Sequence, residues 1–271
     1  QGNVPQDLKF DPARYARTLE VHARLAEGSR SRLIILPETV MPRMLDSVDP
    51  AYLERLRALA ARNGGDLLLG APTRPVAGGY LNSVASFGAS PTQLYHKQHL
   101  VPFGEFVPPG FGWGGRVLAI PLADFSRGEA TQRPLAVAGQ RVAVNICYED
   151  AYGGELIRQL PEATLLVNVS NVAWFGDSLA PAQHLQIARA RALETGRMHL
   201  TSTNTGITAA IGADGRVRAQ LPQFAEGRLD VEVQGYAGAT PYVRFGDAPA
   251  LALAALLLAL AALVARARRS R

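Results

Sequence analysis

The chain alternates between short stretches of strand-like pattern and longer stretches of helix-like pattern. Apolar or β-branched runs with period-two character predict strands at 32–36, 66–70, 80–88, 93–96, 134–138, 141–146, 164–169, 199–204, 207–212, 217–221 and 227–233. Apolar residues three or four apart predict helices at 12–27, 50–63, 152–160 and 181–197. Strands 80–88 and 93–96 predict one hairpin, and strands 134–138 and 141–146 predict another. Hairpins among interleaved helices favour an α/β fold of two mixed sheets packed face to face, with helices outside.

Two of the predicted helices carry the same start signal. Asp11-Pro12 and Asp49-Pro50 each place an N-cap acid before a proline, which suits the first helical position. Gly28 and Gly64 follow the predicted helix ends, where glycine is common.

The last stretch of the chain has a different pattern. Residues 248–265 are uncharged, rich in leucine and alanine, and show no amphipathic stripe. As a helix they extend about 27 Å, close to the ~30 Å hydrocarbon thickness, and the following arginines can reach the interface. A buried core helix is the alternative, but the missing stripe favours a membrane span. We expect a globular domain at 1–240, a transmembrane helix at 246–266 and a basic tail at 267–271, with the C-terminus in the cytoplasm by the positive-inside rule.

Length and charge set further limits. A chain of 271 residues can bury one large α/β core or two small ones. Four of its charges lie in the tail, at Arg266, Arg268, Arg269 and Arg271, so the rest is close to neutral and nucleic-acid binding is not expected. A single cysteine excludes an intrachain disulfide framework and a CxxC metal site. The chain opens at Gln1 without a signal-like apolar stretch, and we expect a mature or trimmed product.

The one cysteine, Cys147, lies where predicted strand 141–146 meets predicted helix 152–160. Backbone N–H groups at such a turn can stabilise a thiolate or a developing oxyanion. A small buried hydrophobe is the plainer interpretation of a lone cysteine. The charged pair Glu149-Asp150, which directly follows the apolar run, favours a nucleophile.

Three charged residues stand in apolar surroundings. Glu38 follows the C-terminal end of a predicted strand, which is where α/β sheets bind ligands. Lys97 follows strand 93–96, and Glu105 lies in a proline-bounded apolar segment. Charges in such settings are costly unless they are paired. The alternatives are a solvated loop carboxylate for Glu38, and an exposed lysine with a structural salt bridge for the other two.

Aromatic residues gather in two loops. Phe111 and Trp113 lie in the glycine-rich segment 110–115, which lacks the Lys-Ser/Thr end of a phosphate loop. Trp174 and Phe175 follow strand 164–169. The glycine-rich segment is either a mobile apolar lid or an ordinary loop.

Three separated motifs resemble the Glu-Lys-Cys triad of the nitrilase superfamily: Pro37-Glu38, Tyr95-His96-Lys97 and Ile146-Cys147-Tyr148-Glu149. Longer strings are similar to the apolipoprotein N-acyltransferases of bacterial envelopes, namely 1–6, 36–39, 97–108, 168–171 with Trp174-Phe175, and 204–208. The resemblance implies a nitrilase-like four-layer α-β-β-α sandwich, a carbon-nitrogen hydrolase catalytic domain at 1–240, followed by the transmembrane helix. Members of that family begin with several membrane helices. We therefore expect this chain to be the last part of a longer, multi-pass protein whose upstream transmembrane bundle is missing here.

The resemblance also implies an activity. Such enzymes transfer a fatty acyl chain from a phospholipid, through a cysteine thioester, to the N-terminal α-amino group of a diacylglyceryl-cysteine lipoprotein. This is the last step of lipoprotein maturation, and it uses no metal or other cofactor. The implied location is the bacterial inner membrane, with the catalytic domain on the periplasmic side. The implied partners are the phospholipid donor, the diacylated lipoprotein acceptor and the membrane.

The matching positions receive roles by the same resemblance. Cys147 is the nucleophile, Glu38 the general base and acid, and Lys97 the cation that stabilises the thiolate and the oxyanion. Glu105 orients Lys97, while Tyr148 and Glu149 support the nucleophile turn, and the Tyr148 N–H is a second oxyanion donor. Phe111, Trp113, Trp174 and Phe175 contact acyl chains, with simple loop packing as the alternative.

Two other functions and one other mechanism stay open. A membrane-anchored nitrilase-like amidohydrolase would let water resolve the thioester of a small amide. A membrane-tethered binding module would do no chemistry at all. Five histidines also allow a Cys-His pair, although none has a spacing that singles it out.

Overall fold

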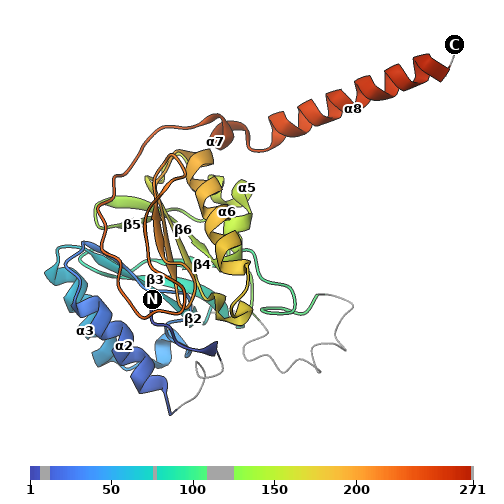
Figure 1. The fold of residues 1–271 in the computed structure, drawn as a ribbon. Coiled ribbons are helices and arrows are strands. Elements are labelled where there is room, and N and C mark those ends of the chain that lie inside the picture. Colours follow the sequence, from blue (N-terminus) through green and yellow to red (C-terminus); the bar gives the residue numbers. More distant parts are fainter. Residues whose placement is uncertain (7–12, 76–77, 109–124, 270–271) are drawn as a thin grey trace.

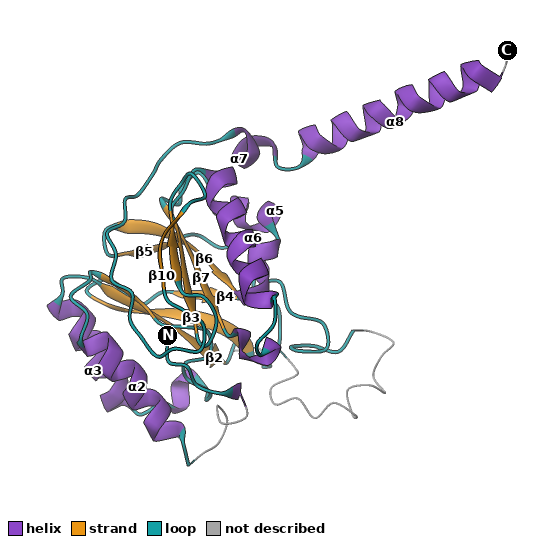
Figure 2. Cartoon of the chain, viewed as in Figure 1, coloured by secondary structure: helices purple, strands orange, loops and turns teal. Residues whose placement is uncertain are grey.

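Two β-sheets lie face to face between two layers of helices (Figures 1 and 2). The computed structural model describes residues 1–6, 13–75, 78–108 and 125–269. Helices α2 (Tyr15–Glu27) and α3 (Pro50–Arg62) cover the first sheet, while α5 (Gly153–Leu156) and α6 (Ala180–Thr195) cover the second. The four-layer α-β-β-α sandwich predicted above is therefore confirmed.

Each predicted hairpin lies at an edge of its sheet. The parallel pairs are at the opposite edge of the first sheet and in the interior of the second. The first sheet has the order β1-β2-β3-β4, and the second has the order β10-β9-β8-β7-β6-β5. The first sheet contains β1 (Leu33–Ile35), β2 (Asp66–Thr73), β3 (Leu81–Gly88) and β4 (Leu94–His96). The second contains β5 (Leu135–Val137), β6 (Gln140–Ile146), β7 (Leu165–Ser170), β8 (His199–Thr203), β9 (Ala209–Ile211) and β10 (Val217–Gln220). Strand β1 is parallel to β2, and β6, β7 and β8 are parallel to one another.

Period-two alternation explains how the central strands serve two cores. On β6, Val142, Val144 and Ile146 point into the core between the sheets. Ala143 lies in the cluster that packs under α5, and Asn145 shares its face because alternate side chains point the same way. Both predicted hairpins, β3–β4 and β5–β6, are present as antiparallel pairs.

The helix predictions hold with two differences. Asp49 caps α3 by accepting from the Ala51 N–H at 2.9 Å, with Pro50 at the first helical position, as predicted. The structure describes α2 from Tyr15 onward, so the predicted start at Asp11-Pro12 lies outside the described residues. The helix predicted at 152–160 is broken into the short α5 and a 3-10 turn (Ile157–Gln159), preceded by another 3-10 turn (Cys147–Ala151). Further short elements are the 3-10 turns Leu45–Ser47 and Val172–Phe175 and helix α7 (Pro241–Phe245).

The strand predicted at 227–233 is wrong as an assignment, although its alternation is real. Leu229, Val231 and Val233 are half-buried and the residues between them are exposed, but the segment pairs with neither sheet. It lies along a cavity of about 570 Å³ that separates it from β1. A period-two pattern reports which side chains face inward, whereas a strand also needs a neighbouring backbone within hydrogen-bonding distance.

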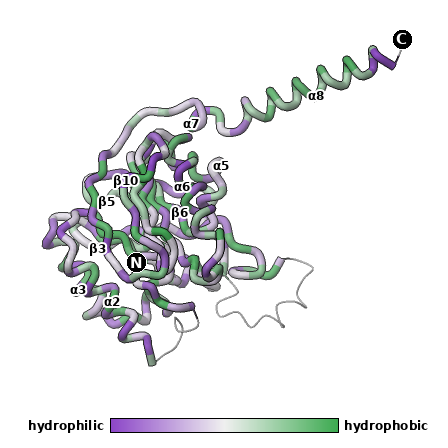
Figure 3. Tube along the Cα trace, in the orientation of Figure 1, coloured by the Kyte–Doolittle hydropathy of each residue, from purple (hydrophilic) through white to green (hydrophobic). Residues whose placement is uncertain are grey.

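Helix α8 (Ala248–Arg269) stands away from the sandwich (Figure 1). Figure 3 shows it as a hydrophobic stretch with a hydrophilic end. Its leucines are exposed, for example Leu258 at 72%. Its 22 residues give about 33 Å of helix, and it is the one described helix that is long and apolar enough to cross a membrane. The boundaries predicted for the domain, the span and the tail stay predictions.

Candidate active site

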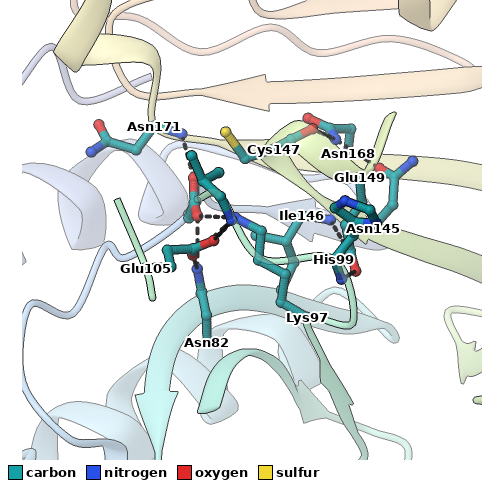
Figure 4. A network of polar contacts seen from close by, with 12 residues as sticks. Asn82, Lys97, His99, Glu105, Asn145, Ile146, Cys147, Glu149, Asn168 and Asn171 are labelled. Carbon is teal, nitrogen blue, oxygen red and sulfur yellow. Dashed lines mark hydrogen bonds and ion pairs between the residues drawn. The ribbon is translucent and has the colours of Figure 1, made fainter. Parts of the chain in front are cut away.

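Glu38, Lys97 and Glu105 meet in one buried cluster after the ends of β1 and β4. Figure 4 shows Lys97 and Glu105 of this cluster side by side. The Lys97 Nζ lies 3.4 Å from Glu38 Oε1 and 2.9 Å from Glu105 Oε1. Lys97 is 1% exposed and Glu38 is 6% exposed, so water does little to screen these charges. The ion pairs keep three otherwise costly charges inside the protein.

Asn82 on β3 completes this cluster. Its Nδ2 donates to Glu38 Oε1 and to Glu105 Oε1, each at 2.8 Å. Glu105 Oε2 also accepts from the Val101 N–H at 2.9 Å. In Figure 4, Asn82 lies on the opposite side of the Lys97–Glu105 pair from Cys147 and Asn171. Asn82 therefore holds both carboxylates from the side of the cluster that is away from Cys147.

The turn that carries Glu38 is positioned by Asn171 and by Gly70. Its Oε2 accepts from the backbone N–H of Asn171 at 2.8 Å, which links it to the end of β7. Gly70 on β2 lies directly beneath the turn, since a Cβ there would come within 2.7 Å of the Glu38 Cα. A side chain at Gly70 would force the backbone of the Glu38 turn to shift.

Cys147 begins the 3-10 turn that follows β6, with a backbone φ of +53°. Left-handed backbone at a non-glycine residue costs about 1–3 kcal/mol and persists where surrounding contacts enforce it. The Cys147 carbonyl accepts from Asn168 Nδ2 at 3.1 Å, and Asn168 also donates to Asn145 Oδ1 at 2.7 Å. Asn145 in turn donates to the fully buried Asp150 at 2.8 Å. These side-chain amides thus hold the Cys147 turn in place through hydrogen bonds from β6 and β7.

Glu149 joins the turn that begins at Cys147 to the loop after Lys97. Its Oε2 accepts from the Ile146 N–H at 2.7 Å and from the Tyr95 hydroxyl at 3.0 Å. Its Oε1 accepts from the N–H groups of Gln98 and His99 at 2.6 and 3.1 Å. Burial raises the pKa of Glu149 to about 7 even though the N–H donors favour the charged form.

The electrostatics describe a resting thiol beside a charged lysine. Burial lowers the pKa of Lys97, but Glu38 and Glu105 outweigh it, and the net pKa is raised. Burial and the Glu38 carboxylate raise the pKa of Cys147 to about 12, while Lys97 and Ser170 act in the opposite direction. Cys147 is therefore a neutral thiol near pH 7. The arrangement therefore suits removal of the proton by a base at the moment of attack, rather than a standing thiolate.

Tyr148, Trp174 and Phe175 are exposed side chains that take no part in the buried cluster. The Tyr148 side chain is 38% exposed, and its hydroxyl is 2.8 Å from the Tyr152 hydroxyl. Trp174 and Phe175 belong to the 3-10 turn after β7 and are 58% and 54% exposed. Phe111 and Trp113 lie outside the described residues. Among the histidines, His96, His99 and His199 are engaged with Ser83, Glu155 and the Ala188 carbonyl.

Sequence reasoning assigned no role to the amides around the site. Asn82, Asn145 and Asn168 are buried on strands whose other residues are largely apolar. A polar side chain at a position that the strand pattern marks as buried needs a partner, and that was the available signal.

Comparison with known proteins gives the chain its relatives. A family model described as carbon-nitrogen hydrolase matches residues 2–242. A protein of Nitrosomonas europaea named apolipoprotein N-acyltransferase is 53% identical over 268 residues, which are 98% of this chain and 54% of that protein. A protein of Ralstonia nicotianae with the same name is 46% identical over 276 residues, covering 99% of this chain and 52% of that protein. A crystal structure of a carbon-nitrogen hydrolase from Helicobacter pylori is similar at a TM-score of 0.60 and 19% identity, covering 77% of this chain and 81% of that one.

These matches differ in what they cover. The chain spans about half the length of the curated relatives it matches. The structural likeness confirms the nitrilase-like sandwich, and the family match ends at residue 242, before α8 begins. A match over 2–242 takes in both sheets, the buried cluster of Glu38, Lys97 and Glu105, and Cys147, and on that basis the chain belongs to the carbon-nitrogen hydrolase family.

Proposed function

We propose that this chain is the catalytic part of a membrane N-acyltransferase that moves a fatty acyl chain from a phospholipid to a lipoprotein. The acceptor is the N-terminal α-amino group of a diacylglyceryl-cysteine, in the last step of lipoprotein maturation. The observation that carries the proposal is the 53% identity, over nearly the whole chain, to a relative named apolipoprotein N-acyltransferase.

The first half-reaction forms a thioester on Cys147. The Glu38 carboxylate takes the thiol proton, and the sulfur attacks the ester carbonyl carbon of the phospholipid. The Lys97 ammonium and the Tyr148 N–H stabilise the resulting oxyanion. Collapse breaks the C–O bond, and the departing lysophospholipid alkoxide takes the proton from Glu38.

The second half-reaction transfers the acyl group to nitrogen. The neutral acceptor amine attacks the thioester carbonyl, and Glu38 removes a proton from the nitrogen. The new C–N bond forms, the C–S bond breaks, and the Cys147 thiolate regains its proton from Glu38. Because Glu38 accepts and returns one proton in each half-reaction, one carboxyl group is sufficient for both.

The remaining residues are assigned supporting roles. Glu105 and Asn82 hold the Lys97 ammonium and the Glu38 carboxylate in contact. Glu149 keeps the nucleophile turn against the loop after Lys97. The exposed aromatic rings of Trp174 and Phe175, together with Phe111 and Trp113, contact the acyl chains.

The membrane arrangement is part of the same proposal. Helix α8 spans the bacterial inner membrane, with its arginine-rich end in the cytoplasm and the catalytic domain on the periplasmic side. An upstream transmembrane bundle belongs to the longer protein. The inference of such a bundle is supported by the length of the relatives, of which this chain spans about half.

A labelled-lipid experiment tests the proposal. The full-length protein is incubated with phospholipid that carries an acyl label, and label on Cys147 is measured by mass spectrometry, with Cys147→Ala as the control. We expect label on the wild-type cysteine and its transfer to an N-terminal diacylglyceryl-cysteine peptide. Absence of any acyl label on a thiol that still reacts with iodoacetamide would contradict the proposal.

A second function is favoured by one observation, the family match to carbon-nitrogen hydrolases. In that case the protein is a membrane-anchored amidohydrolase, and water resolves the thioester formed from a small amide. The same experiment separates the two functions. Loss of label from Cys147 to water, at a rate that the acceptor peptide does not change, would favour the hydrolase.

A further inference from the structure

Ser170, the last residue of β7, carries a buried hydroxyl that the scheme above does not use. The residue is 0% exposed, and the Ser170 Oγ has no hydrogen-bonding partner among the described residues. Its backbone carbonyl accepts from the Asn204 N–H at 3.1 Å. A buried hydroxyl without a partner destabilises a protein, so its presence here calls for a functional explanation.

The place of Ser170 in the sheet directs attention to Cys147. Strands β6 and β7 are parallel, with Ile146 opposite Val169, so the next position on each strand brings Cys147 beside Ser170. Val167 and Val169 face the core between the sheets, which puts Asn168 and Ser170 together on the other face.

One residue on each side of Ser170 in the chain contacts a group of the proposed reaction. Asn168 donates to the Cys147 carbonyl at 3.1 Å, and the Asn171 N–H donates to Glu38 at 2.8 Å. Ser170 lies between these two contacts on the same short stretch of chain. The register of β6 and β7 therefore brings this hydroxyl to the strand end where Cys147 begins, and no hydrogen bond joins the two side chains in the resting state.

We propose that Ser170 is a further catalytic residue, whose hydroxyl donates a hydrogen bond to the Cys147 sulfur when that sulfur carries negative charge. A neutral thiol is a weak acceptor, whereas a thiolate is a strong one. The unused hydroxyl of the resting state thus becomes satisfied when the nucleophile is formed. In keeping with this, Ser170 lowers the pKa of Cys147 against the effect of burial.

This contact acts in both half-reactions and transfers no proton. Sulfur is negative when it attacks the ester and negative again when it leaves the thioester. In the thioester itself the sulfur is once more a weak acceptor, so the hydrogen bond is stronger at the charged stages than in the ground state. An interaction of that kind accelerates the reaction rather than only tightening binding. The part of the inference that concerns acyl transfer rests on the proposed function.

The test measures the alkylation rate of Cys147 by iodoacetamide between pH 7 and 10, on the whole chain in detergent. Below the thiol pKa the rate follows the thiolate fraction and rises about tenfold per pH unit. Glu38, Lys97 and Glu105 also act on this thiol and are unchanged in every variant. For Ser170→Ala we expect a parallel line that is about tenfold lower, because one charge-assisted hydrogen bond is lost. Ser170→Thr, which keeps the hydroxyl, should return the rate to within about threefold of wild type.

Ser202→Ala is the matched control. Ser202 is a buried serine on the adjacent strand β8, and its hydroxyl donates to the Ile35 carbonyl at 3.0 Å. We expect this variant to lose stability yet to be alkylated at the wild-type rate, whereas Ser170→Ala should keep or gain stability, since its hydroxyl is unpaired. If Ser170→Ala does not fold, Ser170→Gly removes the same donor and carries the same expectation.

Two results would overturn the inference. One is alkylation of Ser170→Ala at the wild-type rate across the pH range, and the other is an equal slowing in Ser202→Ala. In the full-length protein, Ser170→Ala should also slow both thioester formation and acyl transfer about tenfold. If the wild-type protein forms no acyl-cysteine but the alkylation difference persists, the proposed function fails while the role of Ser170 toward the thiolate stands.

Discussion

Replacing Glu105 by glutamine tests how far the buried charge cluster depends on paired carboxylates. The Lys97 Nζ lies 2.9 Å from Glu105 and 3.4 Å from Glu38, and the lysine side chain is 1% exposed. At an effective dielectric constant near 20, a pair at 2.9 Å interacts by about 6 kcal/mol before desolvation is subtracted. Glutamine keeps the size of the side chain but removes its charge. It also places an amide NH₂, which is a donor, where the Glu105 Oε2 accepts from the Val101 N–H. Because Glu38 still pairs with the ammonium, we expect the free energy of unfolding to fall by about 3 kcal/mol, near the lower end of the range for broken buried ion pairs.

The assay is urea unfolding of the detergent-solubilised chain, followed by tryptophan fluorescence. Glu54→Gln is the control, since Glu54 pairs with Arg57 on the exposed face of α3 at 3.5 Å and should change stability by less than about 0.5 kcal/mol. A second readout has the opposite sign. Glu105 raises the pKa of Cys147, so Glu105→Gln should leave alkylation of the thiol unchanged or make it faster. Equal stability losses in Glu105→Gln and Glu54→Gln would refute the reasoning.

Three further outcomes follow from the site and the tail. Glu38→Gln should lower the rate of thioester formation at least a hundredfold by removing the base, while each His→Ala variant keeps it; the reverse pattern would support a Cys-His pair. The folded pKa of Glu149 is raised to about 7 from 4.5, so its contribution to stability is fully present below about pH 4.5 and is lost as pH rises through 7. This amounts to about 3 kcal/mol, measured as the wild-type stability minus that of Glu149→Gln from pH 4 to 9, and a flat difference would contradict it. Removing α8 after Asp247 should abolish vesicle association yet shift the midpoint of thermal unfolding by less than about 2 °C, because α8 buries no residue in the sandwich; a large drop would mean that α8 packs on the domain.

Local pattern was sufficient for most of the fold. Alternation along 141–146 placed β6, the Asp49-Pro50 pair placed the start of α3, and the uncharged run from 248 placed α8. These features depend on the residue and its near neighbours, which a sequence records directly. The position of Cys147 at the end of a strand followed in the same way, from an apolar run that stops at a charged pair.

The assembly of the site was decided by tertiary structure. The contact from Asn171 to Glu38 joins residues 133 positions apart, and the contact from Asn82 to Glu38 joins residues 44 positions apart. No local pattern encodes such pairs, because they arise only when the ends of β1, β3 and β7 come together. The same limit explains the errors: segment 227–233 alternates without a partner strand, and helix 152–160 breaks after a turn that the hydrogen bonds of Glu149 shape. Sequence by itself determined which side chains face inward and that a cysteine stands at a strand end, whereas the folded sheets decided which carboxylates and which amide meet the Lys97 ammonium and each other.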